Sequence, residues 1–195
     1  FYPLNGLFLF LPIALAFTFS YALHFTLAAS FAYGYARHWG QSRTGATLAG
    51  LAFAFGGQLT VRIFGGHPNC LWSATWIPAV LWWADLALAR RSLGWAFAGG
   101  LVLGVQVLVA WPQLSSYLYL VLVICVLWRV WQSWREDGEG GGVTGRGRKA
   151  LLTLVLGGLI GAVSLLVGAA YLLPARLSVE GSLRQGGLSY GSAAA

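Results

Sequence analysis

Charged residues are scarce in this sequence of 195 residues, and acidic ones are scarcer still. Charged residues make up 9% of the chain and only five are acidic, whereas 58% of the residues are hydrophobic. A small soluble domain leaves much of its surface in water, so it could not hide this amount of apolar side chain. In lipid, an α-helix satisfies its own backbone polar groups. We therefore expect an all-α integral membrane protein.

Cysteine is also rare, and the arrangement of polar residues excludes several kinds of site. Cys70 lies at the edge of a loop and Cys125 lies inside an apolar run, so we expect no disulfide between them. The sequence contains no paired carboxylates, no nucleophile triad and no cluster with the spacing of metal ligands. No cofactor is evident. A divalent metal is possible, but this sequence contains no set of ligands that supports one.

Methionine is absent, and the chain begins at Phe1, close to an apolar segment. The stretch from Phe1 to Tyr35 has neither a charged leading region nor a cleavage site, so it does not fit a secretory signal peptide. We expect the sequence to be an internal piece of a longer protein, with the N-terminal part of its helical bundle missing.

The apolar residues form runs close to the roughly 20 residues that cross a bilayer. Six runs are expected to span: Leu7 to Tyr35, Thr44 to Phe64, Leu71 to Ala89, Leu93 to Ala110, Leu114 to Trp134, and Ala150 to Leu173. The sequence thus predicts a polytopic transmembrane bundle of about six helices over residues 1–174. Residues 175–195 are polar enough to form an outward-facing tail, which we expect to lead into a missing C-terminal region.

Proline, glycine and mixed charge punctuate these runs. Pro12 lies near the start of the first run, where a kink is tolerable, and Pro174 is expected to end the last. The second run contains glycines that suit close helix packing, namely Gly45, Gly50, Gly56 and Gly57. The glycine-rich stretch from Glu136 to Lys149 is expected to be a mobile loop.

Basic residues follow alternate apolar runs, which predicts an orientation. Nine of the twelve Lys and Arg residues follow the first, third and fifth runs: Arg37, Arg43, Arg90, Arg91, Arg129, Arg135, Arg146, Arg148 and Lys149. The positive-inside rule places these loops in the cytoplasm, so that Phe1 and the tail face outward. Because the basic residues form short clusters between apolar runs, nucleic acid is not an expected partner.

Three proline corners share the predicted outer side. They are Gly65-Gly66-His67-Pro68-Asn69, Ala110-Trp111-Pro112-Gln113 and Leu172-Leu173-Pro174. Helix breaks at membrane depth persist where they are buried in protein or line a wet cavity. Gly66, Pro68, Pro112 and Pro174 could therefore be structural corners of an outward-opening pocket.

The polar residues at these corners are the candidate substrate-binding groups. A phosphate or sugar hydroxyl could be bound by His67, Arg62, Asn69 and Gln113, and a lipid phosphate could be neutralised by Arg176 or Arg184. The alternative is that Gly and Pro merely turn the chain while the polar residues cap helix ends. Glu180 is the only acid on this side, so the corners lack an obvious general base.

Two polar residues within the apolar runs have competing interpretations. His24 could be a functional group facing the bundle interior, or a neutral histidine bonded to a neighbouring helix. Asp85 lies one turn before Arg90 and Arg91. It could be catalytic, but an interfacial acid paired with arginine is the favoured interpretation.

Several motifs together resemble the YfhO-like family of bacterial multi-spanning membrane proteins, which is related to the GT-C glycosyltransferases. They are Phe1-Tyr2-Pro3-Leu4-Asn5, Ser42-Arg43-Thr44-Gly45-Ala46, Phe53-Ala54-Phe55-Gly56-Gly57, Gly66-His67-Pro68, Trp76-Ile77-Pro78, Pro112-Gln113, Leu172-Leu173-Pro174 and Ser182-Leu183-Arg184. Two positions depart from the family. Trp111 replaces the histidine of the second corner, and Leu177 stands where an acid is expected, with Glu180 later.

The resemblance implies a GT-C-like fold in a bacterial cytoplasmic membrane. It also implies transfer of a sugar from a polyprenyl-phosphate donor to a cell-envelope acceptor outside that membrane, with membrane lipid and the lipid-linked sugar as partners. The essential aspartate of such enzymes would lie upstream of Phe1. The alternatives are a transporter or flippase of lipid-linked intermediates, and a membrane scaffold without activity. The sequence predicts no particular oligomeric state.

Overall fold

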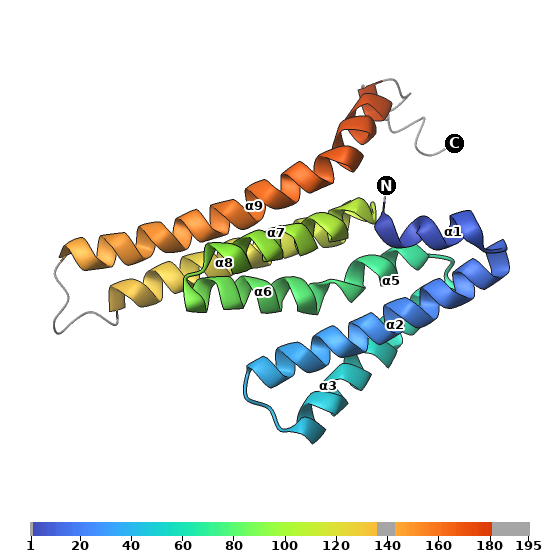
Figure 1. The fold of residues 1–195 in the computed structure, drawn as a ribbon, viewed down its shortest axis with the longest axis horizontal. Helices are drawn as coiled ribbons and strands as arrows, with labels where there is room; N and C mark the ends of the chain where they lie inside the picture. The colour runs from blue at the N-terminus through green and yellow to red at the C-terminus, as the bar shows by residue number, and fades with distance from the viewer. Residues whose placement is uncertain (1, 136–142, 181–195) are drawn as a thin grey trace, which may run out of the picture.

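The computed structural model describes residues 2–135 and 143–180, and every element in these ranges is helical (Figure 1). In chain order the elements are a 3₁₀ turn η1 (Pro3–Gly6), α1 (Leu7–Phe10), α2 (Ile13–His38), α3 (Arg43–Phe55), α4 (Gly57–Phe64), α5 (Pro68–Thr75), α6 (Ile77–Arg90), α7 (Leu93–Leu108), α8 (Pro112–Arg135) and α9 (Val143–Glu180). The all-α prediction is confirmed.

Four stretches are long and apolar enough to cross a membrane: Ile13–His38, Arg43–Phe64, Pro112–Arg135 and Gly147–Ser178. The protein is therefore a membrane helix bundle. The other two expected spans are shorter. Helix α7 has 16 residues, about 24 Å of helix, and the third expected span is divided into α5 and α6.

The most extensive helix–helix interface joins α7 and α9. It depends on small residues, because a Cβ atom on Gly100 would lie 2.9 Å from the carbonyl oxygen of Ile160. Gly104 follows one turn later, and a Cβ there would lie 2.5 Å from the Cβ of Val167. This spacing of two glycines lets helix backbones approach closely in lipid.

Glycine also brings α2 and α3 together, as the sequence predicts for its second run. A Cβ on Gly50 would lie 2.7 Å from the carbonyl oxygen of Ala29. Helix α3 begins with a side-chain cap, since the backbone N–H of Gly45 donates to the hydroxyl of Ser42 over 3.0 Å. The pair α2–α3 therefore forms one side of the bundle, beside the group containing α6 to α9 (Figure 1).

Three of the expected spans are interrupted, and each break has a local cause. At Pro12 the first run is broken rather than kinked, because Leu11 before it is extended, as residues preceding proline prefer. At Gly56 the backbone is also extended, which separates α3 from α4. Pro78 lacks an N–H and its ring conflicts with a preceding carbonyl, so α5 ends before Trp76 and α6 begins after it.

Helix α9 is longer than expected at both ends. It begins at Val143, so the part of the predicted loop from residue 143 to Lys149 is helical, while residues 136–142 lie outside the described residues. It also continues through Pro174 to Glu180, so the prediction that the last span stops at this proline is wrong. Proline is tolerated in apolar helices where neighbouring groups satisfy the freed backbone atoms.

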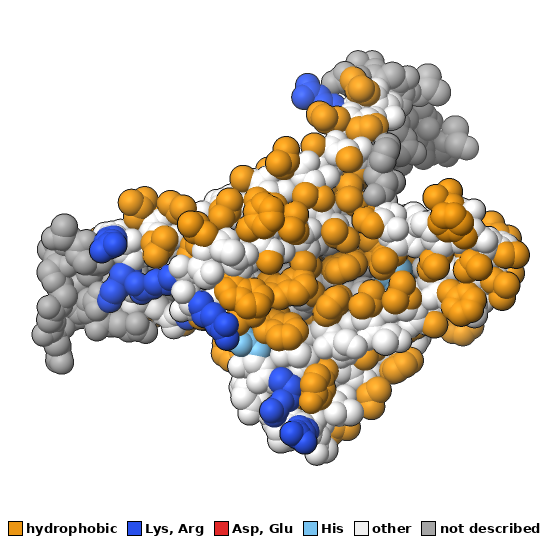
Figure 2. All heavy atoms as spheres, viewed as in Figure 1, with side chains coloured by type: hydrophobic (Ala, Val, Ile, Leu, Met, Phe, Trp, Pro, Cys, Tyr) orange, Lys and Arg blue, Asp and Glu red, His pale blue; other side chains and the backbone are white. Residues whose placement is uncertain are grey.

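The polar and basic side chains are unevenly distributed along the bundle. Lys and Arg gather at the left end and lower edge of Figure 2, whereas hydrophobic side chains cover the middle. The left end in the same view carries the loops between α6 and α7 and between α8 and α9, and the lower edge carries the turn between α2 and α3 (Figure 1). We call these parts together the basic end, and the opposite end, where α4 meets α5 and α7 meets α8, the corner end.

Candidate functional site

The first corner is a tight connection between two short helices, α4 and α5. Gly66 has φ +69°, and its N–H donates to the carbonyl of Ile63 while the N–H of His67 donates to that of Arg62. These two bonds form a Schellman motif, which favours glycine at the left-handed position. Pro68 then begins α5, at a helix position that requires no N–H donor. The three residues from Gly65 to His67 thus reverse the chain.

The second corner has nearly the same construction. Ala110 follows α7 with φ +64°, and its N–H donates to the carbonyl of Val107 over 3.1 Å. An aromatic residue, Trp111, comes next, and Pro112 begins α8. Both corners therefore consist of the same four kinds of residue in sequence. A residue with left-handed backbone is followed by an aromatic residue, by a proline that starts a helix, and by an amide residue, which is Asn69 or Gln113.

The two corners meet through their aromatic rings. The ring centroids of His67 and Trp111 lie 5.9 Å apart with an interplanar angle of 56°. His67 is exposed and Trp111 is half-buried, so the imidazole is accessible to a ligand. Segments more than 40 residues apart in the sequence thus form one surface at the corner end.

Three of the remaining predicted binding residues also lie at this end. Arg62 is in the last turn of α4, half-buried, and its Nε atom is buried with no hydrogen-bond partner in the described part of the chain. Asn69 lies in the first turn of α5 and is half-buried. Gln113 is exposed, but its Nε2 donates to the hydroxyl of Tyr117 on its own helix over 2.9 Å. The structure shows no direct bond from Gln113 to the first corner.

The third predicted corner is not a corner. Pro174 is exposed within α9, although Tyr171 and Leu172 just before it line a cavity of about 150 Å³ with Pro112 of the second corner. Arg176 lies one half-turn beyond the proline, exposed on the same helix. Arg184 lies outside the described residues, as does Phe1.

A chain of neutral hydrogen bonds holds the inner end of α5 against α2. The indole N–H of Trp76 donates to the hydroxyl of Tyr2 over 3.0 Å, so this hydroxyl must donate to His24 Nε2, 2.7 Å away. His24 Nδ1 then donates to the carbonyl of Ser20 over 2.6 Å. With one ring nitrogen donating and the other accepting, His24 is a neutral, structural histidine.

Sequence reasoning did not single out Tyr2, which is 4% exposed and central to this chain of bonds. Burial raises the pKa of its phenol above the usual value, so the hydroxyl keeps the proton that it donates. Tyr2 also stacks on Trp72 of α5, with ring centroids 6.3 Å apart. A polar ring next to a proline near an apolar run was the only available signal.

Helix α5 is tied to α7 by a second buried pair. Gln106 Nε2 donates to the hydroxyl of Ser73 over 2.6 Å, and both residues are fully buried. Gln106 Oε1 and Trp72 Nε1 are buried without a hydrogen-bond partner in the described part of the chain. The short helix α5 is therefore held on two sides, which fixes the position of His67 at its start.

The chemistry available at the corner end is binding rather than acid–base catalysis. Asp85 is the one acidic residue whose side chain the structure describes, and it lies at the basic end. There it pairs with Arg129 at 2.5 Å and His38 at 2.8 Å. An acid paired with arginine is as expected, but the partners are not Arg90 and Arg91. Within the described ranges no three His, Cys, Asp or Glu residues group as metal ligands.

Comparison of the chain with protein-family models, with curated proteins and with solved structures finds no match. The resemblance to the YfhO-like family therefore stays a prediction from its motifs. The class that the structure establishes is a helical membrane bundle with two similar corners joined at one end.

Proposed function

We propose that the joined corners bind the phosphate and sugar of a polyprenyl-linked donor, and that the chain forms part of a membrane glycosyltransferase acting outside the bacterial cytoplasmic membrane. The observation that carries the proposal is the contact between His67 and Trp111. It brings an exposed imidazole and a large aromatic surface together at the end of an apolar bundle. Sugar rings commonly present apolar C–H faces and hydroxyl groups, which such a pair can contact.

Arg62 supports a role for this surface in phosphate recognition. A half-buried guanidinium is a strong partner for phosphate because its planar N–H groups bind two oxygens at once. Among the residues that the structure describes, the buried Nε of Arg62 has no hydrogen-bond partner, which leaves this donor available to a ligand. Arg62 is also tied to His67, since its carbonyl accepts the N–H of His67 over 2.9 Å. A ligand bound by one residue would therefore affect the other.

Each candidate residue has a distinct part in this proposal. His67 bonds a phosphate or sugar oxygen, Arg62 neutralises charge, and Trp111 packs against the sugar ring. Asn69 donates from the first turn of α5, and Gln113 can contribute by exchanging its bond to Tyr117. Catalysis is assigned to no described residue, because a sugar transfer requires a general base and Asp85 lies at the other end.

Transport of a lipid-linked intermediate is a second candidate, favoured by the interrupted helices. The chain is broken at Gly56, just before α4, and at Trp76, just after α5, and each of these two helices has eight residues. Discontinuous helices near the middle of a bundle are typical of transporters, where they line binding sites. The two breaks turn α4 and α5 into a short hairpin that carries His67 at its tip.

The test compares variants of the full-length protein reconstituted in nanodiscs with a polyprenyl-phosphate sugar. His67→Ala is expected to weaken donor binding about tenfold, the usual value of one hydrogen bond to a charged group. Gln41→Ala, an exposed polar change in the turn at the basic end, serves as the matched control. Donor binding that is equal in His67→Ala and wild-type protein would remove His67 from the site.

Transfer and transport are separated by a second measurement on the same protein. In liposomes with donor and acceptor outside, a glycosyltransferase produces glycosylated acceptor without moving donor between leaflets. A transporter moves the donor to the other leaflet with no acceptor present. If wild-type protein binds the donor and shows only movement, the transferase proposal fails and the transporter replaces it.

A further inference from the structure

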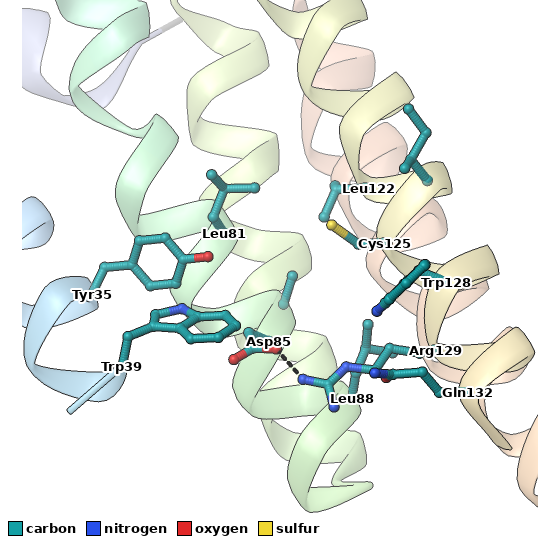
Figure 3. A pocket seen from close by; sticks show the side chains of 12 residues that line it. Tyr35, Trp39, Leu81, Asp85, Leu88, Leu122, Cys125, Trp128, Arg129 and Gln132 are labelled. Atoms are coloured by element: carbon teal, nitrogen blue, oxygen red, sulfur yellow. Dashed lines mark hydrogen bonds and ion pairs between the residues drawn. The ribbon is translucent and has the colours of Figure 1, made fainter. Parts of the chain in front are cut away.

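A crevice at the basic end is separate from the joined corners. It has a volume of about 430 Å³ and lies between α2 and α8, with α6 as its floor (Figure 3). Tyr35 comes from α2 and Trp39 directly follows that helix, while Leu81 and Leu88 come from α6 and Trp128 from α8. Apolar and aromatic side chains thus form its walls, while its polar groups are concentrated at one place.

The polar groups form a three-residue cluster that joins the helices on either side of the crevice. Asp85 on α6 accepts from His38 of α2 through one carboxylate oxygen and from Arg129 of α8 through the other. Asp85 is the most enclosed of the three, with 17% of its side chain exposed, against 23% for His38 and 35% for Arg129. The carboxylate therefore fixes where the guanidinium of Arg129 lies.

Arg129 has binding capacity beyond this ion pair. A guanidinium carries five N–H donors, and in the described part of the chain Arg129 uses one of them, on Nη2, for Asp85. The side chain lines the crevice and is partly exposed, next to the amide of Gln132. An acceptor with several oxygens can occupy the remaining donors without displacing Asp85.

The surroundings favour a negatively charged occupant. Many cationic residues belong to this end: Arg37, Arg43, Arg90, Arg91, Arg129, Arg135, Arg148 and Lys149. The one described carboxylate there, Asp85, already has two cationic or hydrogen-bonding partners. A positive field of this kind attracts anions and repels amines.

The walls of the crevice favour a lipid chain. Ile124 and Trp128 on α8 are 56% and 55% exposed, and in a membrane bundle such side chains face lipid. Trp39 is 62% exposed at the end of α2, where tryptophan typically lies at the level of lipid headgroups. The crevice therefore combines headgroup depth, an apolar interior and a guanidinium.

We propose that this crevice binds an anionic phospholipid, with its phosphate on Arg129 and an acyl chain between α2 and α8. Asp85 is a positioning residue that orients the guanidinium, and His38 holds Asp85 from the opposite wall. The proposal does not depend on the function of the joined corners.

Native mass spectrometry of the full-length protein, with phosphatidylglycerol or phosphatidylcholine added in detergent, tests this site. Wild-type protein is expected to retain phosphatidylglycerol in preference to phosphatidylcholine. Arg129→Gln is expected to lower phosphatidylglycerol retention about tenfold, the loss of a hydrogen bond to a charged group. Arg135→Gln is the matched control, because Arg135 is a cation on the same helix that stacks on Trp131 instead of lining the crevice.

Two further variants separate binding from folding. Arg129→Lys keeps the charge but loses the planar fork, so it is expected to lose affinity by a few-fold, and it carries the test if Arg129→Gln does not fold. Asp85→Asn is expected to reduce the preference for phosphatidylglycerol while leaving phosphatidylcholine retention unchanged. A purely structural role for Asp85 would lower both equally.

Three outcomes would overturn the proposal. Equal retention by wild-type, Arg129→Gln and Arg129→Lys proteins would show that Arg129 does not bind the phosphate. Equal retention of both lipids by wild-type protein would reduce the crevice to a nonselective lipid contact. Alkylation of Cys125, which lines the crevice, provides the last check. If self-association protects this thiol and phosphatidylglycerol does not, a second copy of the chain fills the crevice instead.

Discussion

The two ends of the bundle join their helices by different means. At the corner end, Tyr2, His24 and Trp76 form a chain of neutral hydrogen bonds with buried donors and acceptors. At the basic end, Asp85 joins three helices through His38 and the cation Arg129. Neutral bonds lose little when enclosed in an apolar bundle, whereas charges must be paired to remain there. The difference explains why Tyr2 and His24 can be fully enclosed, whereas the ion-paired cluster of Asp85 borders an open crevice.

The largest loss of stability is expected from Asp85→Ala. It removes the carboxylate and leaves Arg129 and His38 facing each other without a counter-charge, at a cost of about 3 kcal/mol in the free energy of unfolding. Thermal unfolding in detergent measures it. Adding Arg129→Leu to this variant should recover part of the loss, because the unpaired cation is gone. Equal stability of the single and double variants would show that the ion pair does not join the helices.

A smaller loss is expected at the corner end from Tyr2→Phe. The hydroxyl has two partners, so its removal leaves Trp76 Nε1 and His24 Nε2 unpaired and costs about 2 kcal/mol. In contrast with Asp85→Ala, the loss should not depend on salt, since no charge is involved. Unfolding at low and high ionic strength measures both variants.

Alkaline pH should act on the corner end through the same residue. The pKa of Tyr2 is raised by burial, so the folded protein holds its proton more tightly than the unfolded chain. This contribution to stability is complete below the unfolded pKa of about 10 and is lost as pH rises above it. Tyr2→Phe should therefore show a shallower fall in unfolding temperature above pH 10 than wild-type protein. If the unfolding temperatures of the two proteins fall equally with pH, the buried phenol of Tyr2 is not the group that causes the loss.

The smallest effects should distinguish the two corners from each other. Gly66→Ala places a Cβ at φ +69° and is expected to cost about 1 kcal/mol. Ala110→Gly relieves the same strain at φ +64°, less the entropy that glycine adds to the unfolded chain, for a gain of about 0.5 kcal/mol. Opposite signs in thermal unfolding would confirm that the corners share a backbone. If both variants change the unfolding temperature in the same direction, contacts with neighbouring residues, and not the φ angle, determine the effect.

The sequence predicts the class of this fold and the positions of most helices, because apolar runs and lipid together leave few alternatives. It does not predict which breaks interrupt a helix. Pro12 and Pro78 break theirs, whereas α9 continues through Pro174. The residue is proline in all three cases, so the presence of proline alone does not decide whether a helix breaks.

Contacts between residues far apart in the chain also could not be predicted from the sequence. Asp85 could be expected to pair with arginine, but local spacing suggests Arg90, whereas the fold supplies Arg129 from 44 residues away. The meeting of His67 and Trp111 was suggested only by their shared side of the membrane. Tyr2 carried only the weak signal of a polar ring next to a proline, because its role exists only once α2 and α5 lie beside it.

The length of α9 has a consequence for the membrane itself. A helix of 38 residues is about 57 Å long, which exceeds the roughly 40–45 Å thickness of a whole bilayer with its headgroups. If it stood upright, its ends would project into water, so it must tilt or extend beyond the lipid. The bend near its C-terminal end in Figure 1 lies in the part that contains Pro174, so this proline sets the direction in which the chain leaves the bundle.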